Sequence, residues 1–338
     1  MKACLLGRPG SGRETVFRAL TGLGALPAHQ DLRLGEARVA DPRLDYLSSV
    51  FKPRKHTPAR LDLALPKPLA EPHKALKASL ERARDADVLL LVAADFPDAS
   101  GAAPDPAAQA AEICAELVGT DFVALSSRLE RMDEDHRRGR KADPVERALL
   151  VKALELLEND KPLRLDPDLA KDPGLRGYGL LSSKPALVLL NGPDEGGAPA
   201  PQDLGVPALA IRGNLEMELR ALEPDEALEL MGSYGLSEPG VDRVSKTLYD
   251  LMGLISFFTV GEDECRAWTV SKGDNALTAA GQVHSDIQRG FIRAEVVAYE
   301  DFRSAGSFAE AKKKGQFRLE GKTYPVVDGD IVHFRFNV

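Results

Sequence analysis

Short, continuous apolar runs recur along the first two thirds of the chain. Residues 2–6, 88–94 and 186–190 are apolar at almost every position. Runs of this length are typical of strands that are covered on both faces, as in a parallel sheet. A weaker run at residues 61–65 is closed by Pro66. This pattern predicts an α/β domain built on a parallel sheet.

The spacing becomes helical between two of these runs. From about Ala110 to Arg137 apolar residues fall mostly three or four positions apart, which indicates one long helix with an apolar seam. A second helix is predicted from Asp143, a capping residue that is followed by proline and then by Glu146. Its expected buried face is Val145, Leu149, Ala153, Leu156 and Leu157. The two helices together predict a helical hairpin inserted into the α/β domain.

The pattern of apolar and polar residues changes after about residue 251. Strands are predicted at residues 255–260, 264–270 and 291–299, with a helix at 276–287. Near the C-terminus Val332, Phe334 and Phe336 alternate with polar residues, which indicates a final half-buried strand. This region predicts a separate α+β module.

Composition narrows the class of protein. The 338 residues are 43% hydrophobic and 28% charged, the balance of an ordinary globular protein of about two domains. The net charge of −8 disfavours a protein that coats DNA, so no DNA partner is expected. Three widely separated cysteines predict neither disulfides nor a zinc site. Without a long apolar run, we expect no membrane partner and a cytoplasmic location.

The loop after the first strand carries the main candidate site. Gly7 and Gly12 have the spacing of a phosphate-binding loop, G-x-x-x-x-G-K-[ST], in which backbone N–H groups surround phosphate. The loop and the helix start after it supply the candidate cofactor-binding residues: Gly7, Gly10, Ser11, Gly12, Arg13, Glu14 and Thr15. The cofactor would be GTP or ATP.

Two positions depart from the working motif. Arg13 replaces the lysine, and Glu14 replaces the hydroxyl residue that holds magnesium. A carboxylate ~4 Å from a phosphate charge costs roughly 4 kcal/mol at an effective dielectric constant of 20. Thr15 lies one residue too late to substitute for the lost hydroxyl. The sequence therefore predicts the loop geometry but weak nucleotide binding, and no magnesium ligand is assigned.

A second candidate follows the strand at 186–190. Asn191 and Asp194 have the spacing of the N-K-x-D tetrapeptide of guanine-binding folds, in which the Asp binds the base and the Asn braces the loops. The same residues are also common in ordinary turns. Asp62 has no glycine three residues later, so the metal-binding D-x-x-G segment is missing and no catalytic residue is assigned.

The predicted hairpin tip is basic. Arg137, Arg138, Arg140 and Lys141 are candidates for binding RNA phosphate or another partner, although charge runs at loop tips are often only solvated.

Read together, these segments resemble the YchF/Obg-like ATPase family of P-loop NTPases. Its C-terminal TGS module is matched most closely, by Arg266–Val270, Ala279–His284, Gly290–Glu295, Asp328–Asp330 and Phe336–Val338. Upstream matches are Asp41–Asp45, Lys52-Pro53 and Gly235–Gly240. The resemblance implies a P-loop NTPase-type sheet with an inserted helical hairpin, plus a C-terminal β-grasp (TGS) α+β domain. It also implies slow hydrolysis of ATP or GTP and association with ribosomes.

The resemblance gives expected domain boundaries, and it shows where this sequence departs from the family's nucleotide-binding motifs. The α/β domain is expected at 1–109 and 173–250, the hairpin at 110–172 and the TGS domain at 251–338. If Pro58 is aligned with the family's proline, the position of the magnesium-linked Asp falls on Leu65. The first switch loop lacks the expected threonine, and Asp194 stands where Obg-like ATPases carry Glu, which favours guanine.

Two functions from different classes remain open. The chain is either a ribosome- or RNA-binding protein with a pseudo-GTPase domain, or a slow NTPase in which Arg13 replaces the lysine.

Overall fold

A computed structural model describes residues 1–24, 31–67, 72–97, 100–140, 143–193 and 206–337. The chain forms two compact units, Met1–Glu36 with Asp62–Val244, and Ala37–Leu61 with Ser245–Val338. The sequence-based boundary at 251 did not anticipate that residues 37–61 join the C-terminal unit. No helix among the described residues combines the length and apolar character needed to cross a membrane.

The first unit is built on a sheet with strand order β2-β4-β1-β5-β6-β7 within the described residues. The strands are β1 (Lys2–Leu6), β2 (Leu32–Val39), β4 (Ala59–Pro66), β5 (Val88–Ala94), β6 (Ala186–Asn191) and β7 (Ala208–Ile211). From β4 to β7, neighbouring strands pair in parallel. This arrangement confirms the predicted parallel sheet.

Helices surround this sheet and extend from it. They are α1 (Arg13–Thr21), α3 (Pro72–Ala83), α4 (Pro106–Arg137), α5 (Pro144–Leu157), α6 (Pro167–Ala170), α7 (Gly213–Ala221) and α8 (Pro224–Ser233). Helix α9 (Gly240–Leu251) crosses the division between the units, which falls after Val244. Leu80 of α3 and Ile113 of α4 pack on the sheet face that carries Leu89. Leu90 points to the opposite face and is also fully buried. Burial on both faces explains why the strands are continuously apolar.

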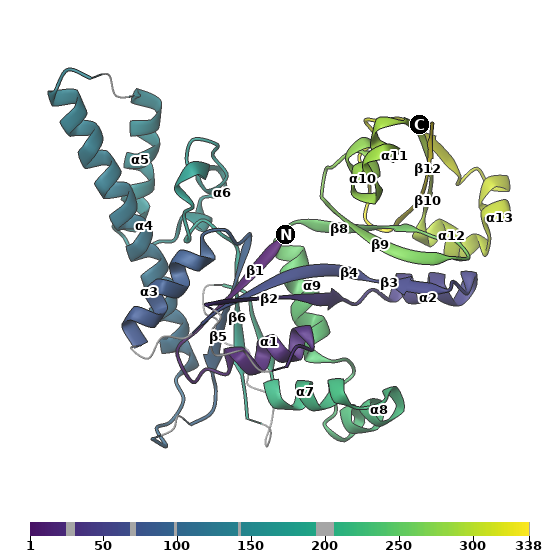
Figure 1. Cartoon of the computed structure of the whole chain (residues 1–338), viewed down its shortest axis with the longest axis horizontal. Helices are drawn as coiled ribbons and strands as arrows, with labels where there is room; N and C mark the ends of the chain where they lie inside the picture. Colours follow the sequence, from purple (N-terminus) through teal and green to yellow (C-terminus); the bar gives the residue numbers. More distant parts are fainter. Residues whose placement is uncertain (25–30, 68–71, 98–99, 141–142, 194–205, 338) are drawn as a thin grey trace. The chain divides into compact units, whose positions relative to one another are not determined.

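The predicted hairpin consists of α4 and α5 (Figure 1). Asp143 caps α5 by accepting the Val145 N–H, as the capping signal predicted. The predicted buried face was partly wrong, because Val145 is 67% exposed. The predicted Ala153 and Leu157 are buried, and Leu150 and Leu154 complete the buried face in the core shared with α4. Their i, i+3, i+4, i+7 spacing forms one stripe, with the predicted Leu149 and Leu156 along its borders.

Asp121 joins the hairpin helix to the chain that leads into β6. Its side chain is fully buried and accepts the backbone N–H groups of Leu181 at 2.9 Å and Ser182 at 2.7 Å. Burial raises the pKa of Asp121 above its ordinary value, although these hydrogen bonds oppose the shift.

We expect Asp121→Asn to flatten the pH dependence of the melting temperature. Because the folded-state pKa is raised, the folded protein takes up this proton more readily than the unfolded chain does. The contribution of Asp121 to the free energy of unfolding is therefore full below its ordinary pKa and falls as pH rises through the folded pKa. Thermal unfolding across mildly acidic pH checks this, with Asp133→Asn on the exposed part of α4 as control. Parallel curves for both variants would contradict it.

The second unit has its own sheet, with strand order β11-β10-β12-β8-β9-β3 within the described residues. The strands are β3 (Lys55–Thr57), β8 (Leu254–Thr259), β9 (Glu264–Ser271), β10 (Phe291–Ala298), β11 (Arg318–Glu320) and β12 (Asp330–Phe336). The helices are α2 (Pro42–Phe51), α10 (Ala276–Val283), α11 (Ser285–Arg289), α12 (Tyr299–Ala305) and α13 (Phe308–Lys313). Residues of α10 pack on the sheet in an apolar core that includes Phe257 and Phe334.

The single helix predicted at 276–287 is two helices. His284 adopts an extended conformation, with φ −165° and ψ 144°, and ends α10. Its side chain accepts the Asp286 N–H and so caps α11. A histidine cap is absent from the usual start signals, which explains why the break was missed.

Candidate nucleotide site

The candidate loop lies where a parallel sheet brings its strand ends together. β1 ends at Leu6, the loop runs from Gly7 to Gly12, and α1 begins at Arg13. The Ser11 N–H donates to the Arg8 carbonyl at 3.1 Å, which closes the loop on itself. The predicted succession of strand, glycine loop and helix is therefore present.

Two of the glycines are required by close contacts. A Cβ on Gly7 would lie 2.6 Å from both the Ser11 hydroxyl and the Val92 carbonyl oxygen. A Cβ on Gly12 would lie 2.1 Å from the side-chain nitrogen of Asn191, and Gly12 also has φ +80°. The loop shape therefore depends on glycine at both positions of the motif.

Features that favour an anion surround this loop. The first-turn N–H groups of α1 have no carbonyl one turn earlier within the helix, which makes a helix N-terminus a natural anion site. Ser11 is only 2% exposed, and its buried hydroxyl has no hydrogen-bond partner within the described part of the chain. Ser11 lines a cavity of about 730 Å³ together with Gly10 and Phe96. The cradle and its unsatisfied hydroxyl fit a phosphate group.

Asn191, at the end of β6, braces the loop from the side. Its side-chain nitrogen donates to the Ser11 carbonyl at 3.2 Å, and its side-chain oxygen accepts the Gly213 N–H at 2.9 Å. Asn191 thus joins the phosphate loop to the start of α7, the role predicted from its position. Asp194 lies outside the described residues.

A smaller cavity of about 270 Å³ adjoins Asn191. Its lining consists of Gly12, Thr15, Phe96, Asn191, Gly192, Pro193 and Asn214. Phe96 follows β5 and Asn214 lies in α7, and neither was nominated from the sequence. Each lies past the carboxyl end of a parallel strand, β5 or β7, a position that points to a site only once the order of the strands is known.

We expect Asn191→Ala to loosen the loop. The substitution leaves the buried Gly213 N–H without its acceptor, which costs about 1–3 kcal/mol. Chemical denaturation should report this loss, and hydrogen exchange should rise at residues 7–16. Asn159→Ala removes an exposed asparagine whose side chain bonds only within its own helical region, and serves as control. Equal behaviour of the two variants would contradict the bracing role.

Arg13 is the first residue of α1 and is buried, with 6% exposure. Its Cδ would be 3.1 Å from a Cβ on Gly7, so its side chain packs against the start of the loop. Burial lowers the pKa of Arg13. Its neighbour Glu14 is exposed to solvent, and Thr15 lines the smaller cavity.

Among the described residues, those at the end of β4 next to the loop do not fit a magnesium ion. β4 lies beside β1, with Ala64 opposite Cys4, so the end of β4 approaches the loop. That end carries Leu65, which is 2% exposed, followed by Pro66. Asp62 lies at the other end of the pairing, where its carboxylate contacts the N-terminal amine at 3.6 Å. Among the described residues, no cluster of His, Cys, Asp or Glu could hold a metal.

The hairpin tip carries paired charges. Arg138 lies 3.5 Å from Glu134, and Arg140 lies 3.0 Å from Asp135. Arg137 is exposed, and Lys141 lies outside the described residues. The three described arginines therefore gather at the tip as predicted, with acidic residues beside two of them.

Comparisons with known proteins extend along the whole chain. It is 33% identical over 365 residues to "Ribosome-binding ATPase YchF" of Bacillus subtilis (strain 168), covering 100% of both proteins. It is 31% identical over 361 residues to the protein of the same name from Escherichia coli O157:H7, covering 100% of this chain and 99% of the other. Residues 254–337 match the family model YchF-GTPase_C, described as "Protein of unknown function (DUF933)".

A solved structure shares the fold. The "Structure of the Schizosaccharomyces pombe YchF GTPase" superposes with a TM-score of 0.84 at 24% identity, covering 99% of this chain and 97% of that one. This match confirms the predicted fold class.

Proposed function

Since the chain belongs to the YchF family, we propose that it associates with ribosomes and acts mainly by binding its partner, with nucleotide hydrolysis weakened or lost. Relatives that align over the full chain carry the name ribosome-binding ATPase. The expected partner is the ribosome or its RNA, with no role for DNA or a membrane and with a cytoplasmic location.

The proposal rests on the contrast, within one site, between the residues that form the phosphate cradle and those at the magnesium positions. The glycine contacts, the buried Ser11 hydroxyl and the Asn191 brace retain a phosphate cradle. The positions that would hold magnesium carry an exposed Glu14 and a buried Leu65. The loop therefore keeps the shape of a phosphate-binding loop, whereas Glu14 and Leu65 do not support binding of a magnesium ion.

This contrast bears directly on catalysis. In phosphoryl transfer, a metal ion offsets the charge that develops on the transferred group. Arg13 is the cation at the lysine position of the motif, but its side chain packs beside Gly7 and is largely removed from water. GTP or ATP would be held by the backbone of residues 10–15 and by Ser11, and we assign no magnesium ligand among the described residues.

Two measurements test the proposal together. Co-sedimentation with ribosomes at physiological salt should show association without added nucleotide, and phosphate release should stay at background. Absence of association would overturn partner binding.

The second candidate is a slow NTPase that uses Arg13, favoured by the retention of a cation at the first position of α1. Phosphate release that Arg13→Ala abolishes would establish it and overturn the proposed loss of hydrolysis.

The hairpin tip is the proposed contact for RNA phosphate, together with the TGS-like C-terminal unit. We expect charge reversal of Arg137, Arg138 and Arg140 to weaken ribosome association at least about tenfold and to reduce its salt dependence, because each lost phosphate contact removes counterion release. Reversal of Lys161, Lys171 and Arg176, which are exposed near the hairpin base, is the matched control. Equal weakening by both sets would point to net charge rather than the tip.

A further inference from the structure

Residues 37–61, which connect β2 to β4, fold with the C-terminal unit, and we term them the coupling segment. Strand β3 of this segment extends the C-terminal sheet by pairing in parallel with β9, with His56 opposite Cys265. The Thr57 hydroxyl donates to the Glu264 carboxylate at 2.5 Å. The segment is therefore an integral strand of this sheet.

Aromatic side chains bind the helix of the coupling segment to the same unit. The Phe51 ring stacks on Phe302 with centroids 5.5 Å apart and lies 5.7 Å from Phe308. Tyr46 meets Tyr299 edge-on at 5.8 Å. Phe302 is only 1% exposed, so it belongs to the interior of the unit. The unit thus contains an aromatic core shared with α2.

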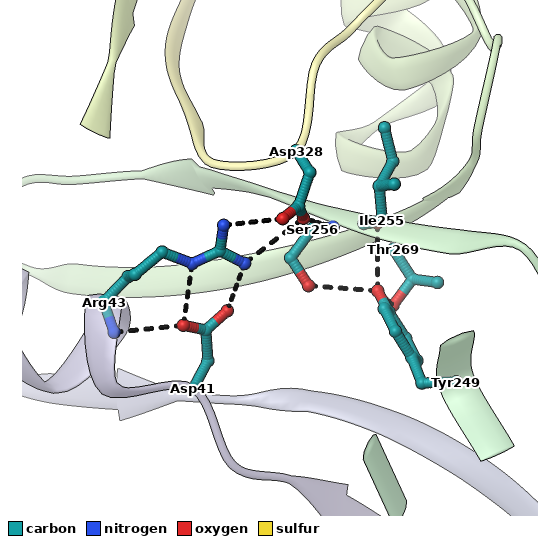
Figure 2. A network of polar contacts seen from close by, with 7 residues as sticks. All are labelled: Asp41, Arg43, Tyr249, Ile255, Ser256, Thr269 and Asp328. Atoms are coloured by element: carbon teal, nitrogen blue, oxygen red, sulfur yellow. Dashed lines mark hydrogen bonds and ion pairs between the residues drawn. The ribbon is translucent and has the colours of Figure 1, made fainter. Parts of the chain in front are cut away.

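A polar clamp holds the start of α2 (Figure 2). The Arg43 guanidinium donates to Asp41 at 2.8 and 2.9 Å and to Asp328 at 2.7 and 3.2 Å. Asp328 also accepts the Ser256 N–H at 2.9 Å. One carboxylate therefore ties the coupling segment to β8 and to the turn before β12. Such charge-assisted, two-pronged bonds are stronger than neutral ones.

The hydrogen bonds of Tyr249 complete this network on the side of α9. Its hydroxyl donates to the Ile255 carbonyl at 3.0 Å and contacts the hydroxyls of Ser256 and Thr269, each at 3.1 Å (Figure 2). Residues from α9, β8 and β9 thus converge beside the clamp.

The strand after the coupling segment leads to the phosphate loop. Residues 59–61 of β4 belong to the C-terminal unit, and residues 62–66 belong to the first unit. In the first unit, β4 pairs with β1 through Asp62, Leu63 and Ala64. β1 runs directly into Gly7. The backbone of β4 and its pairing with β1 therefore connect the coupling segment to the strand that precedes the loop.

We propose that residues 37–61 transmit conformational change between the C-terminal unit and the phosphate loop. A partner that stabilises or displaces the C-terminal unit acts on the coupling segment, and through β4 on the strand that precedes the loop. By thermodynamic linkage the coupling is reciprocal, so an occupant of the loop alters the C-terminal unit equally. The inference does not require that nucleotide be hydrolysed.

Hydrogen exchange of the full chain tests this in the absence of any ligand. Asp328→Asn keeps the size of the side chain but weakens the clamp on Arg43. We expect exchange to rise roughly tenfold in α2 and β9, as befits loss of a charged hydrogen bond, and to rise also in residues 62–66 and 7–12. Asp263→Asn, in an exposed pair with Arg54, is the control and should leave all four regions unchanged.

A second variant keeps the test valid if Asp328→Asn unfolds the whole protein. Phe51→Leu keeps an apolar side chain but removes the ring contacts with Phe302 and Phe308, and the same four regions should respond. A response confined to α2 and β9 in both variants would overturn transmission to the loop. If neither variant changes hydrogen exchange in any of the four regions, the stabilising role of the clamp is overturned as well.

Discussion

Replacing Gly12 with alanine should destabilise the first unit severely and weaken its binding of nucleotide. The residue has φ +80°, which costs an L-residue about 1–2 kcal/mol. The new Cβ would lie 2.1 Å from the Asn191 side-chain nitrogen, so the brace must break as well. Loss of that buried hydrogen bond adds about 1–3 kcal/mol. The combined effect should weaken nucleotide binding at least about a hundredfold, measured by calorimetry beside thermal unfolding.

Gly10→Ala is the matched control for Gly12→Ala. Gly10 has φ +85°, but a Cβ there would meet no atom within 4 Å. It should therefore show only the backbone strain and keep the Asn191 brace. If both variants are destabilised by the same amount, the contact with Asn191 contributes nothing to the effect of Gly12→Ala.

Replacing Glu14 with serine should strengthen nucleotide binding by between about tenfold and a thousandfold. The upper limit is the charge repulsion of roughly 4 kcal/mol expected for a carboxylate ~4 Å from a phosphate. Glu14 is exposed, so solvent screening reduces the penalty below that limit. Calorimetric titration of GTP and ATP without magnesium measures the gain, which salt should diminish.

Glu130→Ser removes the same charge from an exposed position on α4 and controls for net charge. An unchanged affinity in Glu14→Ser, or an equal gain in both variants, would show that Glu14 does not oppose phosphate.

Much of the first unit could be predicted because its signals are local. Strands buried on both faces are continuously apolar, so Val88–Ala94 was identified with its observed bounds. The start of α5 was likewise encoded by Asp143 and Pro144. Which face of α5 is buried depends on α4, a partner distant along the chain. Its seam was therefore misassigned at Val145.

The coupling segment shows what the sequence could not provide. Asp41 and Pro42 form a helix-start signal, and Asp41 does accept the Arg43 N–H. However, nothing near residue 43 indicates that Arg43 pairs with Asp328, 285 positions later. Strand β3 has only three residues and lies at a sheet edge, where periodicity carries little information.

In the candidate site, too, some residues could be predicted from the sequence and others could not. The spacing of Gly7 and Gly12 and the position of Asn191 after a strand predicted the loop and its brace. Gly213 was missed because its role, donating its N–H to Asn191, requires only a backbone group that any residue supplies. Phe96 was missed because a single aromatic residue after a strand has no distinguishing pattern.

We propose that the described part of this chain keeps a phosphate cradle without magnesium ligands. Calorimetric titration of GTP, GDP and ATP into the purified protein, with and without magnesium, tests it most directly. We expect weak binding whose affinity does not improve when magnesium is added. Micromolar binding of one nucleotide that depends on magnesium would contradict it, and would establish the metal site that Glu14 and Leu65 argue against.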